Sequence, residues 1–231
     1  MKANQIHLSA LCLLILSIVL KGGIYGQELN ENPDLDSKVR SFLAEQRGQW
    51  YDLNVPESDG KLLYDLVIKG RYKSALEIGT STGLSGIYIA WALSKTGGKL
   101  ITVEIDEERH KAALENFRKA GLSGYIDARL ADAHTFVKEV KGPFDFVFSD
   151  ADKDWYKNYF LDVDPKLLPG GCYASHNVRV TGRSEYYGNR ERRGYGEQVS
   201  YYEFVKSLGN YESTLNTDGG GMLISYKKTH K

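Results

Sequence analysis

The sequence predicts an α/β fold, in which a doubly wound and mostly parallel sheet carries helices on both faces. Short apolar segments alternate with amphipathic ones from residue 74 to residue 226, as in chains built from strand–helix–strand units. The first apolar segment is followed by a turn with glycines at 79 and 83, and polar residues follow the later segments. Because ligands bind beyond the carboxyl ends of the strands in such sheets, functional residues are expected directly after the strands.

Two helices are expected before the first strand. The segment that begins at Ser37 places three apolar residues on one helical face, namely Val39, Phe42 and Leu43. The segment Ser58–Lys69 does the same with Leu62, Leu63, Leu66 and Val67. With the segments that follow, these helices make a single domain of residues 38–231.

From residue 74 onward, apolar segments predict strands and the amphipathic segments between them predict helices. Strands are expected at Ser74–Ile78, Lys99–Val103, Tyr125–Leu130, Phe144–Phe148, Gly171–Ser175 and Gly221–Tyr226. Helices are expected at Ser85–Ser94, Asp106–Ala120, His134–Val140, Trp155–Leu161 and Glu197–Leu208. A glycine follows the second of these helices at residue 121, as is typical of a helix end.

The first 26 residues have the layout of a secretory signal peptide. Lys2 precedes a short apolar run at residues 8–20, and small residues follow, with a plausible cleavage point after Gly26. The run is shorter than the roughly 20 residues of a transmembrane helix. We therefore expect export to the periplasm or the exterior, with an uncleaved membrane anchor at residues 8–20 as the alternative. Residues 27–37 are polar and are interpreted as a linker.

The composition is that of an ordinary globular protein. The 30 Lys and Arg residues balance the 30 Asp and Glu residues, and 42% of the chain is hydrophobic. The chain lacks the basic excess typical of nucleic-acid-binding proteins, so no nucleic-acid partner is expected. If the leader is cleaved, Cys12 leaves with it and only Cys172 remains, so the fold must depend on its core rather than on a disulfide.

The turn after the first strand has the features of a cofactor-binding loop. Its glycines permit close backbone approach, and the start of the next helix offers unpaired N–H groups. Glu77, within the strand, is hard to explain as a packing residue. Glu104 follows the second strand, where a carboxylate can accept both hydroxyls of a ribose. The alternatives are a helix-packing turn for the glycines and a helix N-terminal charge for Glu104.

Polar residues also follow the fourth and fifth strands. Three acids within residues 150–154 surround Lys153, and they repel one another unless a cation or a substrate balances them. One of them could instead cap the next helix. His176 and Asn177 end the neighbouring strand, so that Asp150, His176 and Asn177 form a candidate set of ligands for a divalent metal. A structural histidine is the alternative.

Residues 179–197 form an unusual segment before the last predicted helix. The segment carries five arginines, three glutamates and three tyrosines, and its glycines suggest mobility. It is interpreted as a lid that recognises an acidic or aromatic substrate, with a solvated surface loop as the alternative. RNA binding is a third interpretation, against which the neutral overall charge and the leader argue.

Taken together, these segments resemble the class I S-adenosylmethionine-dependent methyltransferases, and more closely the cation-dependent O-methyltransferases typified by catechol and caffeoyl-CoA O-methyltransferases. The resemblance extends from Val55 to the C-terminus and is carried by LEIGTSTGLSG (76–86), ITVEID (101–106), FDFVFSDADKDWY (144–156) and GGCYASHNV (170–178). It implies a Rossmann-like, seven-stranded sheet whose last strand is antiparallel, with Leu215–Lys227 as the terminal hairpin. It also implies S-adenosylmethionine as the methyl donor.

The resemblance implies roles for individual residues. The cofactor is expected to contact Val55, Glu77, Gly79, Thr80, Ser85, Glu104, Ala133 and Asp152. Within this set, Glu77 lies on the methionine side and Glu104 at the ribose, and Val55 meets the cofactor carboxylate through its backbone. Lys153 falls where catechol methyltransferases keep a lysine that takes the proton from the attacking hydroxyl.

The resemblance also implies a divalent metal, with Asp150 as its first ligand, and here the sequence departs from the family. The family usually has an aspartate at the position of His176, followed by an asparagine as in Asn177. A histidine removes one negative charge and turns an oxygen site suited to Mg into a mixed nitrogen and oxygen site. The expectation is therefore a softer metal such as Mn, Fe, Co or Zn. A weaker metal or a site with another chemistry are the alternatives.

The function that the resemblance implies is O-methylation of a small substrate with a catechol-like or vicinal-oxygen pattern. Such a reaction is an in-line displacement, so most of the catalytic work is alignment of the oxygen with the methyl group. The alternative is an exported, non-catalytic binding protein that retains the methyltransferase fold. Family relatives are often dimers, so a homodimer is a further expectation.

Overall fold

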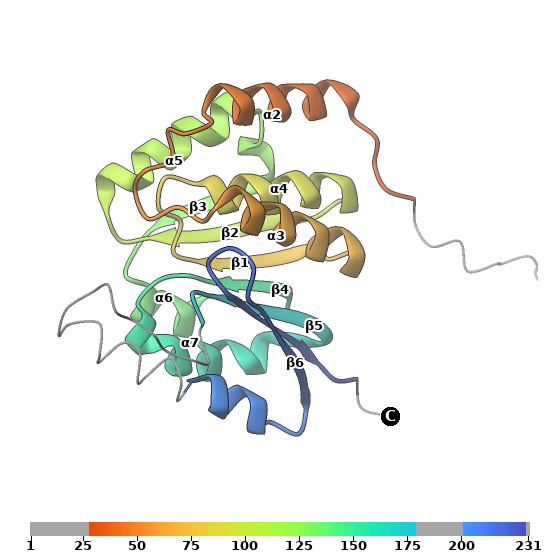
Figure 1. Cartoon of the computed structure of the whole chain (residues 1–231), viewed down its shortest axis with the longest axis vertical. Coiled ribbons are helices and arrows are strands. Elements are labelled where there is room, and N and C mark those ends of the chain that lie inside the picture. The colour runs from red at the N-terminus through yellow and green to blue at the C-terminus, as the bar shows by residue number, and fades with distance from the viewer. Residues whose placement is uncertain (1–27, 179–200, 230–231) are drawn as a thin grey trace, which may run out of the picture.

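The computed structural model describes residues 28–178 and 201–229, which form a seven-stranded sheet with helices on both sides (Figure 1). The strands lie in the order β3-β2-β1-β4-β5-β7-β6. Their bounds are β1 Ser74–Ile78, β2 Lys99–Glu104, β3 Ile126–Leu130, β4 Phe144–Ser149, β5 Leu167–His176, β6 Tyr211–Asn216 and β7 Met222–Lys227. Strands β1 to β5 pair in parallel, and β7 runs antiparallel to β5 and β6. The predicted mostly parallel sheet with an antiparallel last strand is confirmed.

Two strands begin earlier than predicted. β5 begins at Leu167 rather than Gly171, because Leu167 already pairs with Phe144 of β4. The pairing register then shifts before Cys172, in a stretch that contains a proline and two glycines. β6 begins at Tyr211, before the hairpin expected from Leu215. β6 is an edge strand in which buried and exposed residues mostly alternate. Its sequence therefore lacks the continuous apolar run by which the other strands were predicted.

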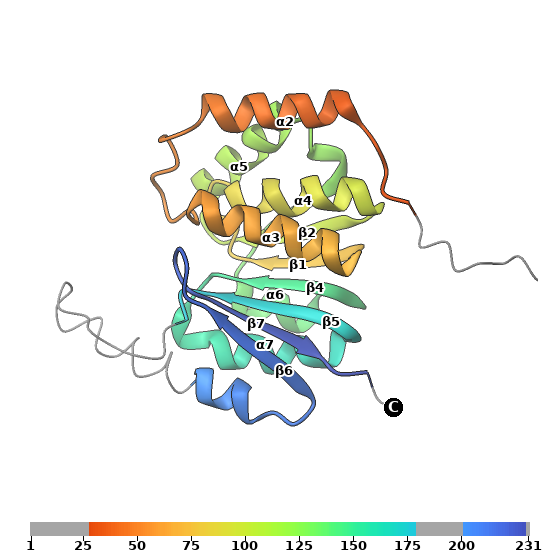
Figure 2. The same ribbon diagram turned by 45° about the vertical axis from the view of Figure 1, so that its right-hand side comes forward.

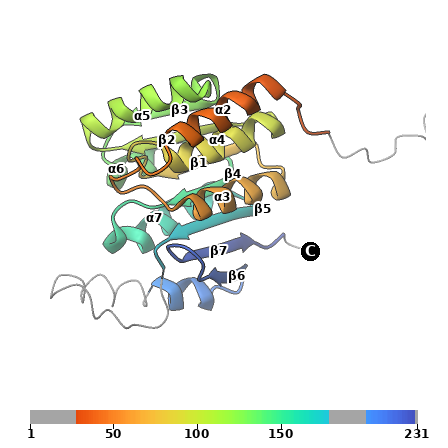
Figure 3. The same cartoon turned by 45° about the horizontal axis from the view of Figure 1, so that its top comes forward.

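The helices divide between the two faces of the sheet. They are α2 Pro33–Glu45, α3 Glu57–Gly70, α4 Leu84–Thr96, α5 Glu107–Ala120, α6 Ala133–Glu139 and α7 Tyr156–Val163. Residues of α2 to α5 share one hydrophobic cluster, and residues of α6, α7 and the segment 201–208 share the other. The two turned views show the sheet between these two sets of helices (Figures 2 and 3).

Helix α2 starts inside the region that the sequence predicts to be a linker. Residues 33–37 belong to the helix, because the Asn32 side chain caps its first turn by accepting the backbone N–H of Leu35 at 3.1 Å. A proline follows the cap, and two acidic residues occupy the first turn, where the helix dipole favours them. One of them, Asp36, pairs with Lys95 of α4 at 2.6 Å and so ties α2 to the domain.

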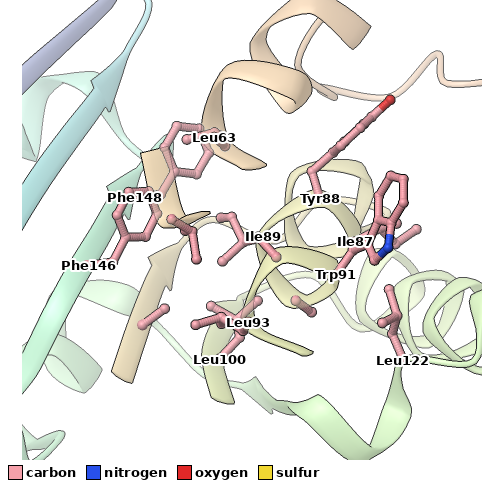
Figure 4. Packing of buried hydrophobic residues seen from close by; sticks show 14 of the residues in the cluster. Leu63, Ile87, Tyr88, Ile89, Trp91, Leu93, Leu100, Leu122, Phe146 and Phe148 are labelled. Carbon is pink, nitrogen blue, oxygen red and sulfur yellow. The ribbon is translucent and has the colours of Figure 1, made fainter. Parts of the chain in front are cut away.

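Strand alternation distributes side chains to the two clusters. On β4, Phe146 and Phe148 pack into the cluster of α2 to α5, whereas Val147 between them packs on the opposite face. Figure 4 shows Phe146 and Phe148 beside Leu63 of α3 and Ile89 of α4. Because both faces of the central strands are buried, their carboxyl ends are held rigidly and can position polar side chains.

Some predictions fall on residues outside the described part of the chain. The leader at residues 1–26 and the arginine-rich segment 179–197 lie there. The last predicted helix, Glu197–Leu208, is described from Tyr201, and residues 201–207 are helical. Within residues 28–178 and 201–229, no helix combines the length and the apolar character that crossing a membrane requires.

Candidate active site

A cavity of about 320 Å³ opens at the carboxyl ends of β1, β2 and β4. The sheet reverses its strand order beside β1, and at such a point the loops that follow β1 and β4 diverge. The two loops approach each other closely, since the backbone N–H of Asp150 donates to the carbonyl of Ile78 at 2.9 Å. Gly79 has φ of 100°, and an added Cβ would lie 3.0 Å from the backbone nitrogen of Ala151. Only glycine suits this position.

Several residues predicted from the sequence line this cavity. They are Gly79, Glu104, Ala133, Asp150 and Asp152. They lie at or just after the carboxyl ends of four strands, β1 to β4, which the parallel sheet brings to one edge. Asp152 also caps the short turn after β4 by accepting the backbone N–H of Asp154 at 3.1 Å, so the capping alternative holds for this residue as well.

Glu104 is held in place by backbone donors. The N–H groups of Ile105 and Asp106 donate to Oε1 at 3.1 and 3.0 Å, and that of Ser81 donates to Oε2 at 2.7 Å. Oε2 therefore keeps a lone pair for a further donor. The carboxylate is fixed in orientation and is one of the residues that line the cavity.

Glu77 is fully buried in β1, two residues before Gly79, and does not itself line the cavity. Its Oε2 accepts the hydroxyl of Thr102 at 2.6 Å, whereas Oε1 has no hydrogen-bond partner within the described residues. Burial raises the pKa of the Glu77 carboxyl to about 7, and the hydroxyls of Ser85 and Thr102 oppose this rise. A buried carboxyl with an unpaired oxygen is costly, so a positively charged ligand group at Oε1 would stabilise it.

Apolar and aromatic side chains that the sequence reasoning missed complete the cavity. Leu53 and Ile105 are 72% and 67% exposed, and both line it. His134 also lines it and stacks on Trp155 with ring centroids 3.9 Å apart. The available signal was an apolar residue within each of two polar segments, next to Asp52 and to Glu104. Such exposed apolar surface suits the flat ring of a ligand.

The loop that carries Leu53 is fixed to the mouth of the cavity. Arg109 at the start of α5 pairs with Asp52 at 2.7 Å, and the Ser81 hydroxyl donates to the Asp52 carbonyl. The amide of Asn54 donates to the Thr82 hydroxyl at 2.8 Å. These contacts hold the loop from both sides, so Leu53 is presented by an anchored backbone.

Four of the predicted cofactor residues do not line the cavity, namely Glu77 and the three described next. Val55 is buried and lines a separate cavity with Leu84 and Tyr88. The Thr80 hydroxyl is turned inward to the hydroxyl of Thr102 at 2.5 Å. Ser85 is buried in the first turn of α4. Contact of these residues with a cofactor stays a prediction.

His176, at the end of β5, lies between two carboxylates. Its Nδ1 is 3.0 Å from Oδ2 of Asp150, and its Nε2 is 2.7 Å from Oδ2 of Asp59 on α3. The side chains of His176 and Asp59 are 4% and 3% exposed. Burial acts to lower the pKa of His176, but the bonds to Asp150 and Asp59 outweigh it, so this pKa is raised. Asp59 was not predicted from the sequence.

Lys153 completes a chain of alternating charges. Its ammonium group donates to Oδ1 and to the backbone carbonyl of Asp150, and to the Tyr156 hydroxyl at 2.9 Å. Burial acts to raise the pKa of Asp150, but the charges and hydrogen bonds of Lys153 and His176 lower it. The Tyr156 hydroxyl also lies 2.9 Å from the carbonyl of His176 and 3.1 Å from that of Ser149, so it joins the ends of β4 and β5.

Comparison with known proteins identifies the family. A model of the O-methyltransferase family matches residues 29–201, about three quarters of the chain. The chain belongs to the O-methyltransferase family. The catechol O-methyltransferase of Niastella koreensis is 36% identical over 135 residues, which are 57% of this chain and 61% of that protein, less than two thirds of its length. Caffeoyl-CoA O-methyltransferase 1 of Arabidopsis thaliana is 28% identical over 197 residues, 82% of this chain and 72% of that protein.

Solved structures share the fold. The O-methyltransferase from Bacillus cereus in complex with SAH has a TM-score of 0.67 and 26% identity, and the match covers 93% of this chain and 96% of that one. A methyltransferase from Podospora anserina, also bound to SAH, has a TM-score of 0.72 and 16% identity over 99% of this chain. The second likeness supports the fold alone, because the sequence identity is low.

The residues of this family member that were predicted to bind a divalent metal do not fit a metal ion as they are arranged. Both ring nitrogens of His176 face carboxylates, and both oxygens of Asp150 accept hydrogen bonds. Asn177 has φ of 55°, and its amide lies 3.5 Å from the carbonyl of Gly220. In residues 28–178 and 201–229, no three His, Cys, Asp or Glu side chains are grouped to hold a metal. The sequence reasoning did not foresee that Asp59 reaches His176.

The turn of the β6–β7 hairpin closes over Asp59 and His176. The backbone N–H of Gly220 donates to Oδ2 of Asp59 at 2.8 Å. An added Cβ at Gly219 would overlap Oδ1 of Asp59, and one at Gly220 would overlap Nε2 of His176. The glycines therefore let the backbone approach the buried pair more closely than any side chain would allow.

Gly220→Ala is expected to lower the free energy of unfolding by about 1–3 kcal/mol, because the methyl group must displace a packed imidazole. Urea denaturation followed by circular dichroism measures this. Gly209→Ala is the matched control, since an added Cβ there meets no atom within 4 Å. It should change the free energy of unfolding by no more than about 0.5 kcal/mol. Equal losses in the two variants would show that the turn does not need to approach His176.

Proposed function

We propose that this chain is an S-adenosylmethionine-dependent O-methyltransferase that methylates a hydroxyl of a small, catechol-like or vicinal-oxygen substrate. The observation that carries the proposal is the cavity beside β1, where Glu104 and Gly79 occur at the strand ends of a chain from the O-methyltransferase family. The relatives of catechol and caffeoyl-CoA type support the substrate class. SAH in the Bacillus cereus structure supports the cofactor.

The residues present fit this cofactor in three ways. The unpaired Oε1 of Glu77 would accept the ammonium group of the methionine part. The free lone pair of Glu104 would accept a ribose hydroxyl. Leu53 and Ile105 offer apolar surface for the adenine in the cavity that His134 also lines. Each feature meets a different chemical part of the same molecule.

When bound, the cofactor would supply a methyl group on a positively charged sulfur, and the substrate oxygen would bond to the methyl carbon as the sulfur–carbon bond broke. Lys153 lies next to Asp150, which lines the cavity, and is the group proposed to meet the hydroxyl. As a neutral amine Lys153 would take the hydroxyl proton, and as an ammonium it would stabilise the ionised oxygen. In either role the proton finally goes to solvent. The contacts to Asp150 and Tyr156 fix where the amine lies.

Cofactor affinity is expected to rise with pH up to about 7, the pKa to which burial raises the Glu77 carboxyl. An ammonium group binds the ionised carboxylate better, so binding below this pKa must also remove the Glu77 proton. As the pH rises towards this pKa, the dissociation constant of SAH should therefore fall by up to about tenfold per pH unit. Above the pKa it should level off. Calorimetry over this pH range measures the slope. Glu77→Gln should bind more weakly and lose the slope; an unchanged slope would mean that another group titrates.

The activity itself is tested by incubating the full chain with S-adenosylmethionine and a panel of catechols and other hydroxyl compounds. Mass spectrometry should detect one added methyl group on an oxygen of at least one vicinal diol. Failure with every acceptor despite SAH binding would contradict the proposed substrate class. Failure of the folded chain to bind SAH would contradict the proposed function as a whole.

We also propose that residues 1–26 direct export and are removed. The support is the sequence pattern of a basic start, a short apolar run and small residues. Mass spectrometry of the protein recovered from expressing cells should give a chain that begins at Gln27. A membrane-bound chain of full length would instead support the anchor at residues 8–20. A homodimer is proposed on the family resemblance, and light scattering measures it.

A further inference from the structure

We propose that a side-chain network of Asp59, His176, Asp150 and Lys153 takes the place of the divalent metal in this chain, so that methyl transfer proceeds without one. The inference rests on the proposed function, because it concerns the same site. The family resemblance implies a metal at Asp150, but the side chains there already satisfy one another. The argument has three parts, namely the histidine, the aspartate and the closing turn.

The imidazole of His176 has no atom left for a metal. Each ring nitrogen lies within hydrogen-bond distance of a carboxylate oxygen, 3.0 Å from Asp150 and 2.7 Å from Asp59. A nitrogen that donates to a carboxylate carries a proton and has no lone pair for coordination. A metal-bound histidine would have one nitrogen on the ion and only the other on a carboxylate. The ring of His176 is therefore held as a bridge between two carboxylates.

Asp150 is likewise occupied on both oxygens. Oδ2 faces His176, and Oδ1 accepts the ammonium group of Lys153. As the side chains lie, the ammonium group of Lys153 occupies the oxygen of Asp150 that would otherwise be open to a cation. With a proton on both ring nitrogens His176 is an imidazolium, so its charge and that of the Lys153 ammonium group balance the two carboxylates. The charge of a metal ion is not needed to neutralise the acids.

The fold buries most of this network and closes it off with the β6–β7 turn. The side chains of Asp59 and His176 are almost fully buried, and Asp59 also accepts the backbone N–H of Gly220 at 2.8 Å. The glycine turn leaves no space beside the imidazole, since a Cβ on Gly220 would overlap it. The side chain of Lys153 is 27% exposed, more than those of the other three, and it contacts Asp150, which lines the cavity. The positive charge offered to a substrate oxygen is therefore that of Lys153.

The test is a titration of the chelator-treated full chain with Mn²⁺, in which electron paramagnetic resonance measures the free ion. Wild type should show no specific binding up to about 1 mM, where even weak protein sites for divalent ions fill. His176→Asp restores a carboxylate beside Asp150 and Asp59 and should bind a single Mn²⁺ at least about tenfold more tightly than wild type. His110→Asp, the same substitution on α5 away from these acids, is the control and should not gain binding.

Each outcome decides the proposal. Stoichiometric Mn²⁺ binding by wild type, or methyl transfer that stops with chelator and returns with metal, would overturn it. A folded His176→Asp that gains nothing over wild type would also overturn it. If that variant does not fold, the wild-type titration and the chelator experiment still decide. SAH binding is measured separately by calorimetry, and its failure would count against the proposed function rather than against the absence of a metal.

Discussion

Asp59→Asn is expected to lower the free energy of unfolding by about 3–5 kcal/mol, because it removes one partner of a buried charge pair and leaves the other. His176 would keep Asp150 but lose the negative charge at 2.7 Å, and the amide oxygen of asparagine would remain as the acceptor for Gly220. The substitution preserves the shape of the side chain, so the loss reports charge and hydrogen bonding rather than a cavity. Urea denaturation of the full chain measures it.

Asp65→Asn is the matched control for this prediction. Asp65 lies on the same helix as Asp59 and is exposed, so the same chemical change should alter the free energy of unfolding by no more than about 0.5 kcal/mol. Similar small effects in both variants would mean that His176 does not depend on Asp59. That result would contradict the role of the Asp59–His176 pair in the network proposed to take the place of a metal.

Lys153→Met is expected to lower kcat for methyl transfer by about 100-fold or more, the contribution of a positioned acid–base group. The dissociation constant of SAH should stay within about twofold of wild type, because a loss confined to kcat indicates an interaction made in the transition state. Initial rates and calorimetry on the same preparation measure the two quantities. Lys141→Met, an exposed lysine on the loop before β4, should leave both unchanged.

The pH profile then separates the two roles proposed for Lys153. A neutral amine that takes a proton gives a rate that rises with pH and reaches a plateau, whereas an ammonium group gives a rate that falls when the amine loses its proton. Full activity of Lys153→Met would contradict both roles. Lost SAH binding in this variant would instead place Lys153 among the cofactor-binding residues.

Much of the site could be predicted because parallel strands end at one edge of the sheet. Gly79, Glu104, Ala133 and Asp152 each follow or end a recognisable strand or loop, so local pattern alone brings them to the same cavity. The strands themselves are apolar segments buried on both faces, which is the strongest signal a parallel sheet gives. The fold, and the edge of the sheet at which the cavity lies, can thus be predicted from local sequence patterns.

The partners of His176 could not be predicted, because they come from distant parts of the chain. Asp59 lies 117 residues from His176 in sequence and sits in an amphipathic helix whose pattern explains it as an ordinary polar position. The turn at Gly219 and Gly220 is equally remote. Sequence neighbours suggested metal ligation for His176, whereas its three-dimensional neighbours are acids that hold both of its nitrogens.

Binding of SAH, the demethylated product of the proposed cofactor, to the folded full chain tests the central claim most directly, and titration calorimetry measures it. Wild type should bind one SAH per chain, and Glu104→Ala should bind it at least about tenfold more weakly, since a fixed acceptor for the ribose is lost. Chelator should not change either value. A folded wild-type chain that binds no SAH would contradict the assignment of the cavity beside β1 as a methyltransferase cofactor site.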